Sequence, residues 1–261
     1  MKNLTKKENN LDFSSFMNEI LNEPSRANEA YRKFYNYSSL NQWHAMMQMD
    51  KLEPINTYKK WQEMGRQVKK GAKAIALCMP IVFDVKDNNG DKTGEKKQFF
   101  VFKNNWFKLS DTEGAEYSEV NTPPDFNLNK MLLALNIKIK DFEKLDGNCQ
   151  GYAIPAENII AINPLAVDKF KTTIHEVAHC LLHSNEAVQM MHGDTLPKSI
   201  KEFEAESTAY LVKVSLGIFD GLEYSRDYIK GWLEGQKNEL KEINFKRVLG
   251  AVNKILNAGT K

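Results

Sequence analysis

The sequence predicts an α+β protein with two domains, and three observations lead to this class. The first is a set of amphipathic helical patterns, with apolar residues three and four positions apart, at residues 173–183, 200–216, 225–233 and 240–256. The second is a pair of strand-like runs, residues 75–85 and 99–106, on either side of the turn signal Asn89-Gly90. The third is an acidic, aperiodic stretch at residues 111–119, typical of a linker. We therefore expect a mixed α/β domain over residues 1–118 and a second domain over residues 119–261.

The composition is that of an ordinary soluble chain. Hydrophobic residues make up 42% of the 261 residues and charged residues 27%, and the formal net charge is +2. The first ten residues are polar, and the longest apolar run, residues 74–83, is too short to cross a bilayer. We therefore expect a cytoplasmic protein with no membrane partner. The widely spaced Cys78, Cys149 and Cys180 form no C-x-x-C pair and are typical of reduced thiols.

The first domain is expected to begin with helices. Apolar residues at helical spacing predict one helix near residues 13–21 and a second element near residues 31–35. Ser38 or Ser39 is suited to cap a third helix. A short helix should end at Gly65, because glycine is favoured just past a helix C-terminus. A basic turn at residues 69–73 then leads into the first strand.

Positive charge is concentrated in this half of the sequence. Between residues 51 and 110 there are thirteen basic and six acidic residues, an excess of seven in a chain whose total is +2. Basic side chains beside aromatic rings suit single-stranded DNA, because phosphates attract Lys or Arg and unpaired bases stack on rings. The candidate DNA-binding residues are Lys59, Lys60, Trp61, Arg66, Lys69, Lys70 and Lys73, and the candidate stacking platforms are Trp61, Phe99, Phe100, Phe102 and Trp106. The alternative is a solvated charged face over aromatic residues of the core.

The second domain is expected to begin with a helix near residues 127–135 and an extended segment at residues 137–139. Residues 149–155 and 159–162 have the pattern of a hairpin joined near Asn158. Asn163-Pro164 would suit the N-cap and the first position of the helix that follows.

That helix contains the most informative motif, His175-Glu176-Val177-Ala178-His179. Each helical residue advances about 100° round the axis, so His175 and His179 lie one turn apart at the margin of an apolar arc. Two imidazoles in this position can bind one zinc ion, and Glu176 can take a proton from a water that the ion activates. The HExxH pattern indicates a zinc peptidase, but it also arises by chance, so a third ligand is required.

The third ligand is sought in residues 200–216. Glu202 and Glu206 share one face of this helix, whereas Glu204 points roughly 200° away from Glu202. The arrangement resembles the gluzincin class of metallopeptidases, in which an E-x-x-A-[DN] pattern supplies the third ligand. The resemblance implies that Glu202 binds zinc and that Glu206 accepts a hydrogen bond from a zinc-bound His. Because Glu stands at the last position of the pattern here, the two roles remain exchangeable.

Two neighbours of the motif are not expected to be ligands. His183 lies about 12 Å along the helix axis from His175, too far for both to reach one ion with bonds of about 2.1 Å. We interpret His183 as a solvated or packing residue. Cys180 points about 100° past His179, away from the ion.

The order of these pieces resembles the antirestriction ArdC family of plasmid proteins. The resemblance is carried by Tyr37-Ser38 with Asn41, Trp61-x-x-x-Gly65-x-x-Val68-Lys69-Lys70-Gly71-x-Lys73, Val101-Phe102, Gly151-Tyr152, the His175 to His179 motif and Ala205-Glu206. It implies an N-terminal single-stranded-DNA-binding domain and a C-terminal zincin-like (gluzincin) metallopeptidase domain that holds Zn²⁺. It also implies a role in protecting incoming mobile-element DNA from restriction.

Two other functions stay open. Residues 149–152 and 159–164 also resemble regulatory zinc proteases of the ImmA and IrrE type, which would cleave a repressor. Alternatively, the chain is a DNA-binding module in which zinc is only structural. If the chain is a peptidase, the strand at residues 159–162 could hold an extended peptide substrate by strand addition.

Overall fold

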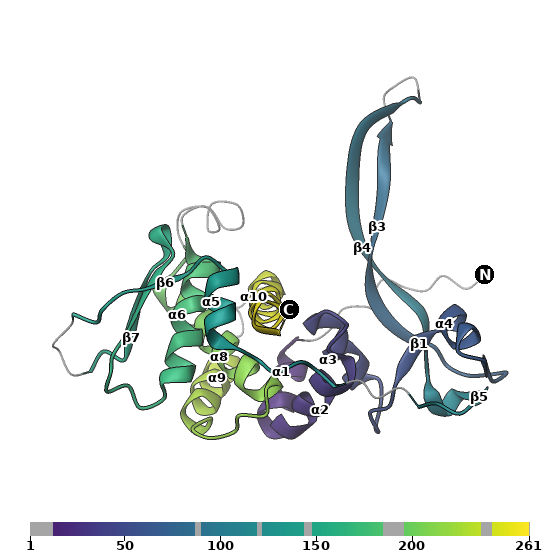
Figure 1. The fold of residues 1–261 in the computed structure, drawn as a ribbon, viewed down its shortest axis with the longest axis horizontal. Coiled ribbons are helices and arrows are strands. Elements are labelled where there is room, and N and C mark those ends of the chain that lie inside the picture. The colour runs from purple at the N-terminus through teal and green to yellow at the C-terminus, as the bar shows by residue number, and fades with distance from the viewer. Residues whose placement is uncertain are drawn as a thin grey trace. The chain divides into compact units, whose positions relative to one another are not determined.

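The computed structural model describes residues 13–86, 90–118, 122–143, 148–184, 196–235 and 242–260 (Figure 1). These residues mix helices and strands, as predicted, and form two compact units. Unit 1 lies within Asn36–Asn121, and unit 2 within Asp12–Tyr35 and Thr122–Lys261. In chain order, unit 1 is therefore inserted between two stretches of unit 2. The predicted turn residue Asn89 lies outside the described residues.

Unit 1 combines short helices with two antiparallel sheets. One sheet has the strand order β1-β4-β3, and the other pairs β2 with β5. The elements are α3 (Ser39–Met47), β1 (Ile55–Thr57), α4 (Tyr58–Glu63), β2 (Arg66–Val68), β3 (Ile75–Lys86), β4 (Lys92–Lys108), the 3-10 turn η1 (Leu109–Asp111) and β5 (Thr112–Gly114). The linker prediction was wrong over β5, because this segment pairs with β2 instead of leaving the unit.

Helix α3 is attached to β3 by two side-chain amides. Ser38 caps the helix by accepting a hydrogen bond from the backbone N–H of Asn41. The Asn41 side chain bonds to both the N–H and the carbonyl of Cys78 at 2.8 Å. Two turns later, the Gln48 side chain bonds to the N–H and carbonyl of Ala76 at 2.9 Å. Because Ala76 and Cys78 alternate along the strand, their backbone groups face the same edge, which α3 covers.

The strands β3 and β4 continue past the rest of unit 1 as a two-stranded arm (Figure 1). Strand β1 pairs only with the Trp106 to Lys108 end of β4. Residues 76–86 of β3 and 92–104 of β4 therefore find their described strand partners only in each other. Phe83, Phe99 and Phe100 on this arm are exposed.

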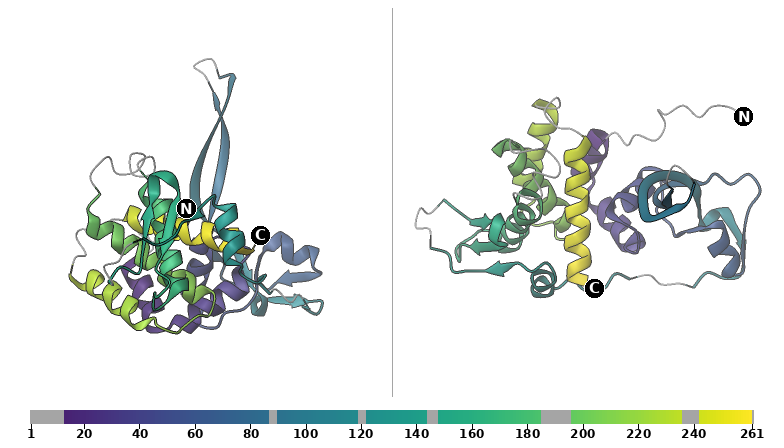
Figure 2. Two further views of the ribbon diagram at one scale, coloured as in Figure 1. Left: turned by 60° about the vertical axis from the view of Figure 1, so that its left-hand side comes forward. Right: turned by 90° about the horizontal axis from the view of Figure 1, so that it is seen from above.

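Unit 2 is mainly helical, with a small sheet in the order β6-β8-β7. Strand β8 runs parallel to β6 and antiparallel to β7. The elements are α1 (Phe13–Asn22), α2 (Pro24–Phe34), α5 (Leu128–Ala134), β6 (Lys138–Ile139), β7 (Gly151–Ile154), the 3-10 turn η2 (Pro155–Glu157), β8 (Ile159–Ile162), α6 (Lys169–His183), α8 (Lys198–Ser215), α9 (Glu223–Gly235) and α10 (Glu242–Thr260). Figure 2 shows α10 as the long yellow helix of this unit.

The first two helices belong to unit 2 by their contacts, whereas the predicted first domain, residues 1–118, includes them. Phe16 and Ile20 of α1 are completely buried. The Tyr210 hydroxyl of α8 donates to the Ile20 carbonyl at 3.5 Å, and the Asn28 side chain of α2 donates to the Ser215 carbonyl at 2.6 Å. An amphipathic pattern predicts a helix with one buried face, but it does not say which partner covers that face.

The helix that carries the metal motif begins later than predicted. Asn163 accepts a hydrogen bond from the Leu165 N–H and makes a turn, so it does not cap the helix. Asp168 is the N-cap, because its side chain accepts from the Lys171 N–H at 2.8 Å. Helix α6 then packs against α8 through small, fully buried residues, including Ala178 and Ala205. Among the described residues, no helix has the length and apolarity needed to cross a membrane.

Candidate metal centre

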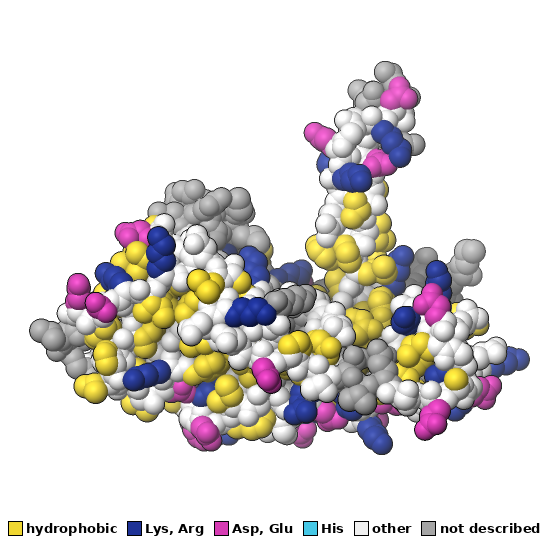
Figure 3. Space-filling model, viewed as in Figure 1, with side chains coloured by type: hydrophobic (Ala, Val, Ile, Leu, Met, Phe, Trp, Pro, Cys, Tyr) yellow, Lys and Arg dark blue, Asp and Glu magenta, His cyan; other side chains and the backbone are white. Residues whose placement is uncertain are grey.

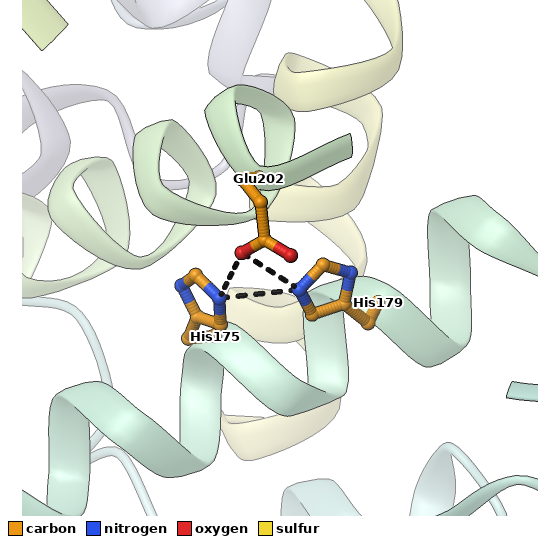
Figure 4. Close-up of side chains that lie close together, drawn as sticks. All are labelled: His175, His179 and Glu202. Atoms are coloured by element: carbon orange, nitrogen blue, oxygen red, sulfur yellow. Dashed lines mark hydrogen bonds and ion pairs between the residues drawn. The ribbon is translucent and has the colours of Figure 1, made fainter. Parts of the chain in front are cut away.

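Three side chains from two helices of unit 2 point at one another (Figure 4). His175 and His179 lie one turn apart on α6, and Glu202 lies in the second turn of α8. The two Nε2 atoms are 3.1 Å apart. Glu202 Oε2 is 3.3 Å from His175 Nε2 and 3.6 Å from His179 Nε2. The predicted spacing of one helical turn therefore brings two imidazoles and a carboxylate together.

These separations suit one tetrahedral metal ion. With bonds of about 2.0–2.1 Å and angles near 109°, the donor atoms around zinc lie about 3.3–3.4 Å apart. The three separations of 3.1, 3.3 and 3.6 Å bracket that value. Two nitrogens and one carboxylate oxygen are also a donor set that zinc accepts. The residues therefore fit a divalent ion with one coordination position left over.

The outer nitrogen of His175 is held by a second glutamate. His175 Nδ1 donates to Glu206 Oε2 at 3.0 Å, and Lys171 Nζ donates to the other oxygen, Oε1, at 2.8 Å. Glu206 is buried and lies one helical turn beyond Glu202. Glu202 therefore faces the inner nitrogens, whereas Glu206 faces an outer one. Glu202 as the ligand and Glu206 as the partner of a zinc-bound His, the roles that the gluzincin resemblance implied, stay a prediction that this geometry allows.

The outer nitrogen of His179 contacts another histidine. His179 Nδ1 and His183 Nδ1 are 2.8 Å apart, and His183 Nε2 donates to Glu204 Oε2 at 2.9 Å. His183 is buried, which corrects one of the two interpretations given above, and it is not a member of the potential ligand set formed by His175, His179 and Glu202. Glu204, which points away from Glu202 as predicted, is the carboxylate behind His183.

The acid–base properties of the metal-free cluster follow from these contacts. Burial alone lowers the pKa of His175, but hydrogen bonds to Glu202 and Glu206 outweigh it and raise this pKa to about 9. Hydrogen bonds from His175 and His179 hold the pKa of Glu202 well below its usual value. Burial raises the pKa of Glu206, and contacts with His175 and Lys171 override it and lower the value to about 2. Without an ion, a proton on His175 provides the positive charge that the two carboxylates attract.

Glu176 lines a cavity of about 720 Å³ next to the donor cluster. Its side chain is nearly buried, and strand β7 passes close to it at Gly151. A Cβ on Gly151 would come within 2.8 Å of Thr172 Cγ2 and 3.2 Å of Glu176 Cγ. Glycine at this position therefore allows the strand to lie against α6 at the cavity wall.

Sequence reasoning missed three polar side chains around this cluster. His183 and Glu204 are buried and continue the hydrogen bonds away from His179, and Lys171 contacts Glu206. Lys171 stands four residues before His175, so the helical period does indicate that it shares the His175 face. The contact between His183 and Glu204 has no comparable local signal, because the two residues lie on different helices.

In unit 1, the structure separates the candidate DNA-binding residues into three groups. Trp61 is completely buried and donates from Nε1 to the Phe107 carbonyl at 2.9 Å. This corrects its prediction as a stacking platform, because no ring face is open to a base. Arg66 donates to the side chain and carbonyl of Thr112 and to the Ala115 carbonyl. Its guanidinium joins β2 to β5. The exposed members are Lys59, Lys60, Lys69, Lys70 and Lys73.

The aromatic candidates divide in the same way. Trp106 is nearly buried, and Phe102 packs on the His44 ring at 4.6 Å between centroids. Phe99 and Phe100 are 46% and 67% exposed, which leaves ring faces open to solvent. Phe83, which the sequence reasoning did not single out, is 45% exposed and meets the edge of Phe99. Figure 3 shows hydrophobic side chains along the lower part of the arm and charged ones towards its tip.

The fold and the cluster together define a two-unit α+β protein with a candidate mononuclear metal centre. Comparison with known proteins narrows this class. Residues 19–107 match the family model described as the N-terminal domain of anti-restriction factor ArdC. The chain is 27% identical over 274 residues to an uncharacterized protein of Bacillus anthracis. That match covers 86% of this chain but spans only 46% of the length of the relative.

Two crystal structures of the antirestriction ArdC protein from the R388 plasmid have a similar fold. The metal-free structure matches with a TM-score of 0.51 and 19% identity, over 95% of this chain and 96% of that one. The Mn(II)-bound structure matches with a TM-score of 0.54 and 17% identity, over 96% and 99%. The domain match over residues 19–107 and the shared fold confirm the predicted resemblance to the ArdC family.

Proposed function

We propose that the protein is a single-stranded-DNA-binding antirestriction protein of a mobile element, with a zinc-dependent peptidase centre in unit 2. The observation that carries the enzymatic part is the convergence of His175, His179 and Glu202 beside a cavity that Glu176 lines. The match of residues 19–107 to the N-terminal domain of anti-restriction factor ArdC supports the DNA-binding part. A solved relative binds Mn(II), which supports a divalent ion at such a fold.

Each residue of the centre has a distinct role in this proposal. His175, His179 and Glu202 would hold the ion, because their Nε2, Nε2 and Oε2 atoms face one another. A bound Zn²⁺ would polarise the scissile carbonyl and lower the pKa of the attacking water. Glu176 accepts the proton of that water and delivers it to the leaving amine. Glu206 orients the His175 ring, and Lys171 holds Glu206 in place.

The cavity is wide enough for an extended peptide. Its wall includes Gly151 and Tyr152 of β7, a strand whose described strand partner is β8 on one side. The other side of β7 can pair with the backbone of a substrate by strand addition. This replaces the expectation that residues 159–162 would hold the peptide, because β8 is the central strand and has neighbours on both sides.

The peptidase proposal is tested with Glu176→Gln and denatured, fluorescently labelled casein as substrate. The carboxamide keeps the shape of the side chain but cannot accept the proton, so cleavage should fall by about 100- to 10,000-fold. Zinc content, measured on the same preparations, should remain at one ion per chain. Equal cleavage by the variant would contradict the role of Glu176. Bound zinc without any cleavage by the wild-type protein would instead favour a structural ion.

The proposed DNA surface consists of the arm and the basic turn. Phe99 and Phe100 offer rings to unpaired bases, and the exposed Lys69, Lys70 and Lys73 offer charges to phosphates. The test is fluorescence anisotropy of a labelled single-stranded oligonucleotide at several salt concentrations. Replacing one phosphate contact, as in Lys70→Gln, should reduce the slope of log affinity against log salt by about 0.7. The exposed Lys254 of unit 2 provides the control, since Lys254→Gln should leave the slope unchanged.

The titration, together with assays of protein cleavage and of protection from restriction, distinguishes the alternative functions. No binding by the wild-type protein at low salt would contradict the DNA-binding proposal. A regulatory protease that cleaves a repressor would show little DNA affinity and one specific protein substrate. Full protection of DNA from restriction by Glu176→Gln would favour a DNA-binding module whose zinc is structural.

A further inference from the structure

A continuous chain of buried polar contacts leads away from His179 into the core of unit 2. His179 Nδ1 meets His183 Nδ1 at 2.8 Å, and His183 Nε2 meets Glu204 Oε2 at 2.9 Å. Glu204 Oε1 then accepts from Arg247 Nε at 3.1 Å and from Asn244 Nδ2 at 2.9 Å. The chain crosses three helices: the histidines lie on α6, the glutamate on α8, and the last two residues on α10.

The members of this chain are far more buried than surface ion pairs. The side chains of Glu204, His183 and Arg247 are 0%, 2% and 4% exposed. Burying a charged carboxylate is costly unless it is paired and hydrogen-bonded, so Glu204 must be held by its partners. Arg247 also donates to the Leu182 carbonyl next to His183, which fixes the guanidinium between α6 and α8. Glu204 and Arg247 therefore fix the orientation of the His183 ring.

The contacts determine which nitrogen of each ring carries a proton. The Glu204 carboxylate accepts from Asn244 Nδ2 and pairs with the Arg247 guanidinium, which supplies the positive charge that balances it, so the carboxylate is ionised and only accepts. Because Arg247 already balances the charge of Glu204, the buried His183 ring needs no charge of its own and has one N–H. That N–H must be at Nε2, facing Glu204, which leaves Nδ1 as an acceptor. His179 must then donate from its own Nδ1.

We propose that His183 and Glu204 are positioning residues that hold His179 with its Nδ1 protonated, so that the Nε2 lone pair faces Glu202 and His175. The proposal rests on the metal-binding function proposed above, because a neutral imidazole can bind an ion only through an unprotonated nitrogen. His175 receives the same orientation directly from the carboxylate of Glu206. His179 is oriented by a carboxylate indirectly, because His183 lies between His179 and Glu204.

The proposal makes a direct prediction for the metal-free protein. In long-range ¹H–¹⁵N spectra of the imidazole groups, His183 should be neutral and protonated at Nε2. The His183 signals are assigned by their loss in His183→Asn. A ring of His183 protonated at Nδ1 would overturn the proposal, because Nδ1 could then not accept from His179.

Metal affinity provides the second test, with Zn²⁺ and Co²⁺ titrated into each variant. His183→Phe fills the space but removes the acceptor, so Zn²⁺ should bind about 10- to 100-fold more weakly. His183→Asn places an oxygen near the Nδ1 position and should recover most of this loss. Glu204→Gln should also weaken binding: its oxygen stays with Asn244 and Arg247, so its NH₂ faces His183 and reverses the direction of the chain. The visible absorption of bound Co²⁺ reports whether the coordination geometry changes.

A matched control distinguishes positioning from general stability. Tyr210→Phe removes another buried polar contact from α8, the hydrogen bond to the Ile20 carbonyl, without touching this chain. It should lower stability but leave Zn²⁺ affinity within about twofold. If His183→Phe fails to fold, the comparison of His183→Asn with Glu204→Gln carries the test. Equal Zn²⁺ affinity in all folded variants would overturn this proposal alone, whereas no Zn²⁺ binding by the wild-type protein would also overturn the proposed metal centre.

Discussion

The two units differ in what they bury and expose: unit 2 buries a cluster of charged side chains, whereas unit 1 exposes aromatic rings on its arm. In unit 2, Glu204 is completely buried and each of its oxygens has partners from other helices. In unit 1, Phe100 is 67% exposed on the arm, where residues 76–86 and 92–104 find their described strand partners only in each other. A catalytic or metal centre needs groups held in one geometry, whereas a surface that stacks on bases needs open ring faces. The contrast indicates that the units suit different kinds of ligand.

The largest expected effect concerns the buried ion pair between Arg247 and Glu204 in unit 2. Arg247→Met should leave the buried Glu204 carboxylate uncompensated and lower the free energy of unfolding by about 3–5 kcal/mol. The control in unit 1 is Lys60→Met, which breaks an exposed ion pair with Glu63 at 3.7 Å and should cost about 0–1 kcal/mol. Urea unfolding followed by circular dichroism measures both. Similar losses in the two variants would remove the contrast between the units.

A second variant tests how tightly β7 lies against α6. Gly151→Ala places a Cβ 2.8 Å from Thr172 Cγ2 and 3.1 Å from the Ala161 carbonyl oxygen. The strand or the helix must move, which should cost about 1–3 kcal/mol and reduce casein cleavage by displacing Glu176. A Cβ added at Gly231 of α9 would meet no atom within 4 Å, so Gly231→Ala should stabilise by about 0.5–1 kcal/mol. The two alanines should therefore shift the urea midpoint in opposite directions.

Phe100→Ala tests whether the exposed rings on the arm of unit 1 bind DNA. Losing one stacking platform should weaken single-stranded DNA binding by about 1–3 kcal/mol, measured by anisotropy at constant salt. Because the ring is largely exposed, the urea midpoint should change little. Leu133→Ala, at a residue of unit 2 that is 82% exposed, is the control for removing an exposed apolar side chain. Unchanged DNA affinity in Phe100→Ala would remove this ring from the proposed surface.

The last test is a pH dependence of zinc binding, which concerns unit 2 alone. The pKa of His175 is raised to about 9 without an ion, so binding an ion must expel a proton. Zinc affinity should therefore rise about tenfold per pH unit between about 6.5 and 9 and then level off. A raised pKa stabilises the metal-free fold fully below the unfolded value of about 6.5, and this stabilisation is lost as pH rises through 9. Calorimetric titrations at several pH values measure the affinity, and a flat profile would contradict the assignment.

The helical period predicted much of the candidate centre. It placed His175 and His179 on one face, excluded His183 from the donor set and separated Glu204 from Glu202, and the structure has all of these relations. These predictions succeeded because each depends only on spacing within one helix. The choice between Glu202 and Glu206 required the second helix, since both share a face and only the packing of α8 on α6 distinguishes them.

Other features depend on contacts that local patterns do not encode. His183 contacts Glu204, and Glu204 contacts Arg247, on helices that begin 15 and 59 residues further along the chain than His183. Trp61 lies in a basic segment, which predicts an exposed side chain. In the structure its side chain is completely buried and donates to the Phe107 carbonyl of β4. The capping prediction for Asn163 failed because the chain makes a further turn before Asp168, and either residue type can cap a helix.

The path of the chain through the two units has a practical consequence for preparing them separately. A fragment that ends at residue 118 carries α1 and α2 without the helices that bury Phe16 and Ile20, and it should associate through these uncovered side chains. The shorter piece from Asn36 onward avoids this problem. Conversely, unit 2 is recovered intact only when both of its stretches are present, for instance by replacing the inserted segment with a short flexible bridge.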